Sequence, residues 1–381
     1  MKRRIAVITT SRADYSHLYW PLHDLSRHRE VDLQLIAMGP HLSPEFGQTI
    51  REIEQDGLPI AARIECLLSS DTDVGMAKTI GIATLSLADC LGQTRPDLLL
   101  LIADRYEMLA PASVALALRI PVAHIEGGEI SEGAIDDAVR HALTKMSHVH
   151  FTSTFAARDR VIALGEEEWR VHRAGAPSID HLRRDQLYDR LQLKEQLNVE
   201  LKSPAAVIAY HPVTILRDTT QEADELFGAL RKVPGQLLFC YPNADAGSRD
   251  LIQRTEQYRT LRPDTHIFVN LPALTYWSLL RQVDIMVGNS SSGIMETPSF
   301  ALPTINVGMR QQGRERARNI LDAVPERADI LAKIAFARSQ QFRASLVGME
   351  NPYGDGHASE KIVDVLTSVP LGERLLIKKM R

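Results

Sequence analysis

The sequence predicts an α/β protein built from two doubly wound parallel sheets. Two observations carry this prediction. Short, almost uninterrupted apolar runs alternate with longer amphipathic stretches over most of the chain, and such runs are typical of parallel strands covered by helices on both faces. The pattern then starts again after a polar stretch near residues 180–202, which indicates a second sheet of the same kind. Ligands of such sheets bind outside the carboxyl ends of the strands, so two of these domains facing each other would enclose a cleft.

Four apolar runs predict the strands of the first domain, at residues 4–9, 31–38, 98–102 and 121–125. After the first strand, apolar side chains recur at spacings of three and four residues. This spacing predicts a helix with one buried face, made by Tyr15, Leu18, Leu22 and Leu25. Helices are also predicted at residues 109–118 and 134–146.

The second domain is predicted from five further runs, at residues 205–210, 236–240, 265–269, 284–287 and 303–307. The turn-forming Gly175-Ala176-Pro177 stretch marks the boundary. We therefore expect one domain at residues 1–175 and a second at 176–365, with a C-terminal helix at 366–381 joining the first domain.

Composition excludes several classes of protein. The 381 residues are 44% apolar and 24% charged, with a formal net charge of −4, which excludes global disorder and does not favour a nucleic-acid partner. The widely spaced Cys66, Cys90 and Cys240 fit neither a disulfide framework nor a zinc site and predict reduced thiols in a cytoplasmic protein. No apolar run approaches the ~18 residues of a membrane span. We expect no metal and no cofactor.

Polar side chains follow the predicted strands of the first domain. Arg12 comes directly after strand 4–9, where a guanidinium and free backbone N–H groups suit an anion; a plain helix cap with a surface arginine is the alternative. Asp104 follows strand 98–102 and is equally consistent with an active-site acid or a helix cap.

The segment from residue 124 to 141 is the densest in titratable groups. Gly127-Gly128 follow a strand directly and would let the backbone approach a ligand closely. Carboxylates that converge repel one another, which raises at least one pKa and yields both an acid and a base. The candidates are Glu126, Glu129, Asp136, Asp137 and their partner Arg140. A solvated loop followed by an Asp–Arg helix pair is the alternative.

Two segments of the second domain suit a phosphate-bearing ligand. His211 follows strand 205–210 and can serve in acid–base work, although a satisfied buried histidine is the alternative. After strand 284–287, a serine-rich turn opens a helix and supplies hydroxyl and N–H donors for phosphate, with a simple serine cap as the alternative. Its candidate residues are Ser290, Ser291, Ser292 and Gly293, with Glu296 for ribose hydroxyls and Arg310 and Arg314 for phosphate charge.

With these residues, the chain resembles the hydrolysing UDP-N-acetylglucosamine 2-epimerases of sialic-acid and legionaminic-acid biosynthesis. The matching segments run in order along nearly the whole chain: TSRADY (10–15), DRYE (104–107), HIEGGE (124–129), IDDAVRHALTKMSHVHFTST (135–154), HP (211–212), NADAGS (243–248), GNSSSGIMETPS (288–299), RQQGR (310–314) and NPYG (351–354). HIEGGE and NSSSG are the hydrolysing form, whereas the non-hydrolysing epimerases usually have HVEAG and SDSGG there.

The resemblance implies a fold, a reaction and roles. The fold is two Rossmann-like domains facing a cleft, the GT-B architecture. UDP is eliminated anti across carbons 1 and 2, and water then adds syn to release the free 2-epimeric sugar. Asp104, Glu126 or Glu129, and the Asp136/Asp137 pair would be the acid–base carboxylates, and His211 would assist departure of UDP. Arg12 and the three serines would hold the diphosphate and Glu296 the ribose, with Arg140, Asn243, Gly293, Arg310 and Arg314 completing the binding set.

Substrate and assembly are less closely specified. We expect UDP-N-acetylglucosamine as substrate; the alternative is UDP-2,4-diacetamido-2,4,6-trideoxy-glucose. The aromatic side chains of Tyr15, His17, Tyr19 and Trp20 on the first helix would favour the second sugar if they line its site; core packing is the alternative. Family resemblance also implies a homodimer or homotetramer, with helix 109–118 as a candidate contact. A non-hydrolysing epimerase, a glycosyltransferase and a non-catalytic nucleotide-sugar sensor are the competing functions.

Overall fold

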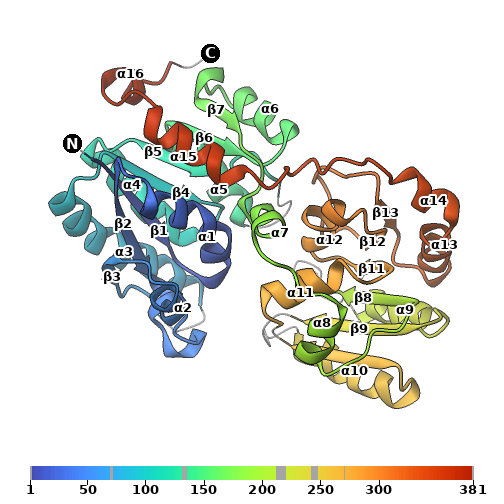
Figure 1. The fold of residues 1–381 in the computed structure, drawn as a ribbon. Helices are drawn as coiled ribbons and strands as arrows, with labels where there is room; N and C mark the ends of the chain where they lie inside the picture. The colour runs from blue at the N-terminus through green and yellow to red at the C-terminus, as the bar shows by residue number, and fades with distance from the viewer. Residues whose placement is uncertain are drawn as a thin grey trace. The chain divides into compact units, whose positions relative to one another are not determined.

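The computed structural model describes residues 2–68, 72–130, 135–211, 220–241, 248–269 and 271–379. The chain forms two compact units (Figure 1). Unit 1 contains Met1–His181 together with Tyr353–Arg381, and unit 2 contains Leu182–Pro352. Each is a parallel-sheet α/β domain, as the sequence predicts.

Among the described residues, unit 1 holds a seven-stranded sheet in the order β3-β2-β1-β4-β5-β6-β7, with every neighbouring pair parallel. The order reverses between β1 and β4, and this switch point is where ligands of doubly wound sheets bind. The strands are β1 (Arg3–Thr9), β2 (Val31–Met38), β3 (Ile60–Ile64), β4 (Leu98–Ile102), β5 (Val122–Ile125), β6 (Val149–Thr152) and β7 (Val171–Arg173).

Helices cover this sheet and contribute one apolar face each to its core. In α1 the predicted face of Tyr15, Leu18, Leu22 and Leu25 is buried. The α-helices of unit 1 are α1 (Arg12–Arg27), α2 (Ile50–Gln55), α3 (Asp73–Thr94), α4 (Leu109–Leu118), α5 (Ile135–Met146), α6 (Phe155–Ala163), α15 (Ala358–Ser368) and α16 (Glu373–Leu376), while α7 (Asp180–Arg184) crosses the boundary between the units.

The chain returns to unit 1 earlier than residue 366, the expected position. The buried Asp180 carboxylate accepts hydrogen bonds from the backbone N–H groups of Ala358 (2.9 Å) and Ser359 (2.8 Å) and so caps α15. The Ser359 hydroxyl also donates to Asp24 on α1 (2.6 Å). These contacts place the boundary after His181 and the return at Tyr353, where the sequence suggested 175 and 366.

The last residues are fixed to unit 1 by buried charges. Arg170 is fully buried, and its guanidinium donates to the carbonyl oxygens of Leu375 (2.7 Å), Ile377 (2.9 Å) and Arg374 (3.1 Å). Lys378 lies 2.6 Å from the carboxylate of Glu166. In Figure 1 the red C-terminal helices α15 and α16 accordingly lie with the N-terminal unit.

Unit 2 repeats the architecture with a six-stranded sheet, within the described residues, in the order β10-β9-β8-β11-β12-β13. Its neighbouring strands are parallel, and separate apolar clusters cover its two faces. The elements are α8 (Arg190–Leu197), β8 (Ala205–Ala209), α9 (Thr220–Leu230), β9 (Gln236–Tyr241), α10 (Ser248–Leu261), β10 (Thr265–Val269), α11 (Ala273–Leu280), β11 (Ile285–Gly288), α12 (Ser292–Met295), β12 (Thr304–Val307), β13 (Ile320–Ala323), α13 (Arg327–Ala337) and α14 (Gln340–Ser345).

Candidate active site

The carboxyl edge of the unit 1 sheet gathers the first set of predicted site residues. Ile102 at the end of β4 is in register with Ile125 at the end of β5. Asp104 therefore follows one strand, and Glu126 the neighbouring strand, at the same edge. Arg12 begins α1 immediately beyond β1, which pairs with β4. The topology thus brings three separate sequence motifs to the switch point of one sheet.

Arg140 is the centre of the acidic cluster. Its side chain is buried, and its guanidinium forms an ion pair with Asp104 and donates to the backbone carbonyl of Glu129 (2.8 Å). Asp137, one turn earlier on α5, lies 3.7 Å from the same guanidinium and 3.2 Å from the ring of His141. A single buried cation therefore holds Asp104, Asp137 and the loop that carries Glu129 in fixed positions, which preorganises the carboxylates.

Glu126 is positioned by its backbone and by a neighbour. Its φ of +66° is a left-handed conformation that costs a non-glycine residue free energy. Its N–H donates to the carbonyl of Phe151 (2.8 Å), and its Oε1 lies 2.7 Å from Nδ1 of His17 on α1. Strain held in this way is characteristic of functional positions.

The glycines after Glu126 have a packing reason that sequence reasoning missed. Gly128 has a φ of +80°, and a Cβ there would stand 2.3 Å from the carbonyl oxygen of Ala157 on α6. A Cβ on Gly127 would stand 3.2 Å from Nδ1 of His124. Both glycines let the loop pack against neighbouring elements of unit 1, so they do not by themselves indicate contact with a ligand.

Asp136 has a raised pKa, as the sequence predicts for at least one carboxylate of the cluster. Burial raises its pKa, the charge of Arg105 opposes this, and Glu107 adds to it. The increase thus comes first from desolvation and only secondarily from a neighbouring carboxylate. Glu129, the remaining predicted acid of unit 1, is buried.

Arg105 and Glu107 belong to the same edge and were not singled out by the sequence. Arg105 donates to the fully buried Glu107 carboxylate (2.7 Å). Asp14, also buried, accepts a hydrogen bond from the N–H of Thr10 (3.1 Å), and its pKa is raised by burial against the opposing charge of Arg105. Arg105 and Glu107 lie in the DRYE segment and Asp14 in the TSRADY segment. Membership of these segments is the sequence feature that could have identified them.

Arg12 lies at the exposed end of this edge. Its Nε is 3.4 Å from Glu52, and both side chains are about half exposed. The preceding Ser11 caps α1 by accepting from the N–H of Asp14 (3.3 Å). The helix-cap alternative therefore applies to Ser11, while Arg12 is left accessible for an anion.

In unit 2, His211 and the serine turn are joined through Asn289. The N–H of His211 donates to Oδ1 of Asn289 (2.7 Å), and Nδ2 of Asn289 donates back to the His211 carbonyl (2.8 Å). Burial, followed by the charge of Arg310, lowers the pKa of His211 to about 4. The imidazole is therefore neutral near pH 7 in the unliganded chain and is suited to hydrogen bonding rather than to ion pairing.

The serine turn is shaped by glycine and by hydroxyl contacts. Gly288 has a φ of +150°, and a Cβ there would stand 2.0 Å from the carbonyl oxygen of Ala209. Ser290 and Ser292 hydroxyls lie 3.1 Å apart, and the Tyr276 hydroxyl lies 2.7 Å from that of Ser292. Since α12 has only four residues, its dipole is small, and the hydroxyl groups are the stronger donors here.

Two arginines supply positive charge beside the turn. Nη1 of Arg310 donates to the Asn289 carbonyl (3.0 Å), and Nη1 of Arg314 lies 3.4 Å from Sδ of Met295. Within the described part of the chain, neither arginine is in an ion pair with a carboxylate. Ser291 occupies the N-cap position of α12 but its side chain makes no capping hydrogen bond, and Gly293 lies within the helix and is buried. Glu296 follows that helix, nearly buried, and Asn243 lies outside the described residues.

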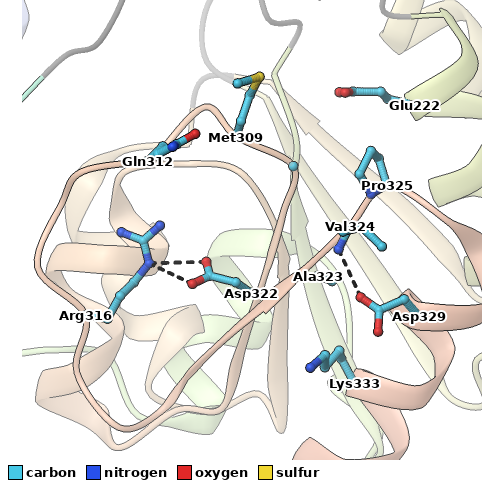
Figure 2. A pocket seen from close by; sticks show the side chains of 11 residues that line it. Glu222, Met309, Gln312, Arg316, Asp322, Ala323, Val324, Pro325, Asp329 and Lys333 are labelled. Atoms are coloured by element: carbon cyan, nitrogen blue, oxygen red, sulfur yellow. Dashed lines mark hydrogen bonds and ion pairs between the residues drawn. The ribbon is translucent and has the colours of Figure 1, made fainter.

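A separate hollow of about 580 Å³ opens at the carboxyl ends of β12 and β13 (Figure 2). Its charged groups are largely satisfied: Nε of Arg316 lies 3.2 Å from both carboxylate oxygens of Asp322, and Asp329 accepts from the N–H of Val324 (2.9 Å). It contains none of the predicted site residues. We therefore do not include it in the candidate active site.

Two parallel-sheet α/β domains, with acidic side chains after the strands of one and hydroxyl groups and arginines after those of the other, define the GT-B architectural class. The chain matches the UDP-N-acetylglucosamine 2-epimerase family over residues 23–367 and belongs to that family. It is therefore a UDP-sugar 2-epimerase.

Curated relatives extend over most of the chain. It is 37% identical to the GDP/UDP-N,N'-diacetylbacillosamine 2-epimerase (hydrolyzing) of Campylobacter jejuni, over 84% of each chain. It is 34% identical to the UDP-N,N'-diacetylbacillosamine 2-epimerase (hydrolyzing) of Legionella pneumophila, over 99% of each. The UDP-N-acetylglucosamine 2-epimerase of Neisseria meningitidis is 30% identical over 88% of each.

Solved structures share the fold. A crystal structure described as a UDP-N-acetylglucosamine 2-epimerase from Listeria monocytogenes superposes with a TM-score of 0.80 at 15% identity, covering 97% of this chain and 96% of that one. The Neisseria meningitidis enzyme crystallised with UDP-GlcNAc gives 0.75 at 18% identity, covering 95% and 99%. At these identities the likeness shows the GT-B-like fold.

Proposed function

We propose that the chain is a hydrolysing 2-epimerase that converts a UDP-linked 2-acetamido sugar into UDP and the free 2-epimeric sugar. In the first step a carboxylate removes the carbon-2 proton, the bond from carbon 1 to the diphosphate oxygen breaks, and a 2-acetamidoglycal forms. Water then adds across the double bond, with its hydroxyl at carbon 1 and a proton at carbon 2. The observation that carries this proposal is the cluster of partly exposed Asp104 and Asp137 on the buried Arg140, at the same sheet edge as Glu126.

Within this cluster, we assign opposite roles to two carboxylates. Glu126 is fixed by His17 (2.7 Å) and a strained backbone, which suits a base that must stand at one position relative to carbon 2. The pKa of Asp136 is raised by burial, a shift toward the protonated form that a proton donor needs. Asp104 and Asp137 orient the cluster through Arg140, and Glu129 completes the acidic set.

The second set of residues is proposed to hold UDP. Hydroxyl donors of Ser290, Ser291 and Ser292 and the charges of Arg310 and Arg314 would neutralise the diphosphate as it leaves. His211, neutral when unliganded, would donate a hydrogen bond from its ring N–H to the oxygen of the departing diphosphate. Glu296, Gly293 and Asn243 are proposed for the ribose and nucleotide, with Arg12 and Arg140 at the sugar and phosphate.

The relatives favour the diacetamido sugar over UDP-N-acetylglucosamine. Those named for N,N'-diacetylbacillosamine, which is 2,4-diacetamido-2,4,6-trideoxy-glucose, are 37% and 34% identical, against 30% for the relative named for UDP-N-acetylglucosamine. The aromatic residues give less support, because Tyr15 is buried in the core with its hydroxyl bonded to Asp56 (2.6 Å). We therefore propose the diacetamido sugar first and UDP-N-acetylglucosamine second.

Product analysis in deuterated water tests the reaction and the substrate together. Each UDP sugar, and the GDP-linked diacetamido sugar, is incubated separately with enzyme and followed by NMR. We expect UDP and a free 2-epimeric sugar carrying deuterium at carbon 2, with the highest kcat/KM for the UDP-linked diacetamido sugar. A product that stays linked to UDP would indicate the non-hydrolysing reaction, and no release of nucleotide from any of the three would contradict the proposal.

Location and assembly follow as part of the same proposal. The three cysteines are free thiols, which supports a cytoplasmic enzyme. We propose a homodimer or homotetramer whose free sugar product serves the synthesis of sialic- or legionaminic-type acids.

A further inference from the structure

The hollow of about 580 Å³ at the carboxyl ends of β12 and β13 has the dimensions of a ligand pocket (Figure 2). Pockets for small molecules generally measure about 300–1,000 Å³. Its walls come from four segments of unit 2: the start of α9, the loop 308–316 after β12, the loop after β13, and helix α13. None of its lining residues has a role in the reaction proposed above, so the hollow is available to a second ligand.

Most charged groups of the hollow already have a partner within the protein, and these pairs shape its walls. Both carboxylate oxygens of Asp322 lie 3.2 Å from Nε of Arg316, so this pair adds no net charge. One carboxylate oxygen of Asp329 accepts from the N–H of Val324 (2.9 Å), which fixes the loop after β13 against α13. Val324 itself is 55% exposed and gives the hollow an apolar wall.

Four side chains keep hydrogen-bonding capacity for a ligand. Among the described residues, neither the Lys333 ammonium group nor the Gln312 side-chain amide has a partner. Glu222 uses one carboxylate oxygen to accept from the Tyr210 hydroxyl (3.0 Å); in the described part of the chain its second oxygen, like that of Asp329, has none. In Figure 2, Glu222 and Lys333 stand at opposite ends of the hollow. The hollow thus combines two carboxylates with a single unpaired ammonium group.

This set of groups favours a neutral ligand rich in hydroxyl and amide groups. Phosphate or a nucleotide would bring negative charge against two carboxylates, with one ammonium group to offset it. A divalent cation needs several oxygen ligands, and no group of three potential metal ligands occurs in the part of the chain that the structure describes. A wholly apolar ligand would remove the charged groups from water without giving them partners, which is costly.

We propose that the hollow binds the free acetamido sugar that the enzyme releases. Such a sugar is uncharged, and its hydroxyl and N–H groups can donate to Glu222 and Asp329. Its acetamido oxygens can accept from Lys333 and Gln312, and its methyl groups can pack on Val324. The identity of the sugar rests on the proposed function. The diacetamido sugar, with three methyl groups, fits the apolar wall better than N-acetylmannosamine, which has one.

The hollow shares a wall with the proposed UDP site. Arg310, on loop 308–316, donates to the Asn289 carbonyl beside the serine turn (3.0 Å). On the same loop, Arg316 lines the hollow and donates to the carbonyl of Arg314 (2.6 Å). A sugar in the hollow therefore restrains the loop that carries the phosphate-binding arginines without taking the place of the nucleotide. Coupling between two such sites is reciprocal, so we expect the free sugar to inhibit turnover non-competitively with the UDP sugar.

Binding to the full chain is measured by NMR titration with free 2,4-diacetamido-2,4,6-trideoxymannose and with N-acetylmannosamine, each at saturating UDP. We expect a dissociation constant of about 1 mM or tighter for the diacetamido sugar. Val324→Trp fills the hollow and should weaken binding at least tenfold. Val347→Trp is the matched control, because Val347 is 81% exposed in the same unit and lies outside the hollow. Circular dichroism melts show whether both variants fold.

A second variant keeps the test decisive if Val324→Trp does not fold. Lys333→Met should weaken binding about fivefold, because it removes one charged hydrogen-bond donor. Lys232→Met, at an exposed lysine of the same unit outside the hollow, should bind as the wild type does. Without added sugar, Lys333→Met should keep kcat/KM within about twofold of the wild-type value, and it should lose most of the inhibition by the free sugar.

The outcomes separate this proposal from the proposed function. Absence of binding at about ten times the expected dissociation constant would overturn the sugar site. So would equal binding by the wild type, Val324→Trp and Lys333→Met, or inhibition that is purely competitive with the UDP sugar, and each of these leaves the reaction intact. Binding that depends on Val324 and Lys333 in a chain that releases no nucleotide would support the sugar site and contradict the reaction.

Discussion

Nδ1 of His17 lies 2.7 Å from Oε1 of Glu126, although the two residues are 109 positions apart. The contact joins the first helix of unit 1 to the loop after β5. It gives the proposed base a hydrogen-bonding partner on a rigid element, so that the carboxylate is held by both its backbone and its tip. Preorganisation of this kind lowers the cost of reaching the reactive geometry.

Removing the ring of His17 should therefore reduce turnover more than binding. His17→Leu is expected to lower kcat about 10²-fold with KM within about threefold, whereas His17→Gln, which can still donate to Glu126, should retain activity within about tenfold. His28→Gln, at the far end of the same helix, serves as the control. Equal kcat values for the Leu and Gln variants would show that the contact does not position Glu126.

Asp104→Asn is expected to reduce kcat about 10³-fold or more while leaving stability nearly unchanged. The amide oxygen can still accept from Arg140, so the cluster keeps its geometry but loses a charge. UDP release and thermal unfolding are measured on the same preparation. Asp97→Asn is the control, because Asp97 lies just before β4, at the opposite end of the same strand, and pairs with Arg4. A fully active Asp104→Asn would remove the acidic cluster from the mechanism.

Gly128→Ala should destabilise unit 1 strongly. The added Cβ would have to displace the carbonyl of Ala157 in α6, and φ is already left-handed, so we expect a loss of about 3 kcal/mol or more. Gly57→Ala isolates the backbone effect, because Gly57 has a similar φ of +75° and open space around it; it should cost about 1 kcal/mol. The free energy of unfolding of both variants is measured in urea. Equal decreases for Gly128→Ala and Gly57→Ala would argue against the clash.

Acid should destabilise the fold through buried neutral histidines. Burial lowers the pKa of His124 to about 4 from an ordinary value of 6.5, and its Nε2 donates to the Ala103 carbonyl (2.7 Å). Between pH 6.5 and 4 the unfolded chain therefore binds a proton at His124 that the folded chain does not bind. The stability that the neutral His124 ring contributes is fully present above pH 6.5 and is lost as the pH falls toward 4.

His41, His148 and His211 have pKa values lowered to about 4 as well, in each case first by burial, so their contributions add to the same pH window. Urea unfolding at pH 7.0, 6.0 and 5.0 should show a declining free energy of unfolding. His124→Gln, which does not titrate, should give a shallower decline. A free energy of unfolding that stays constant over this range would contradict the assignment of neutral rings.

Most strands of the two sheets could be predicted from apolar runs in the sequence. The other strands could not, for a physical reason. The central strands β4, β8 and β11 are buried throughout, as β1 is from Ile5 onward, and these segments are nearly continuous apolar sequence. The missed strands β3, β6, β7 and β13 are short or carry polar residues. β6, for example, contains His150, whose burial is possible because Glu166 lies 3.1 Å from its ring.

The sequence could predict which candidate residues follow neighbouring strands, but not the contacts that they make. Acids following β4 and β5 had to meet at one edge, because parallel strands end there together. That Arg140 would be buried between Asp104 and Asp137, or that Asn289 would bind both backbone groups of His211, depends on tertiary packing that no local pattern encodes. The sequence placed His17 on the first helix near the sugar site but did not predict its contact with Glu126, and it did not single out Arg105.

The two-segment make-up of unit 1 has a consequence for biosynthesis. Arg170 already has acceptors in the first segment, Glu167 and the carbonyl of His148, but its hydrogen bonds to the carbonyls of residues 374–377 need the second segment. On the ribosome, the residues of unit 2 have all emerged before α15 and residues 374–377 are made. The N-terminal unit, although most of it is made first, therefore becomes fully native only after unit 2 is able to fold.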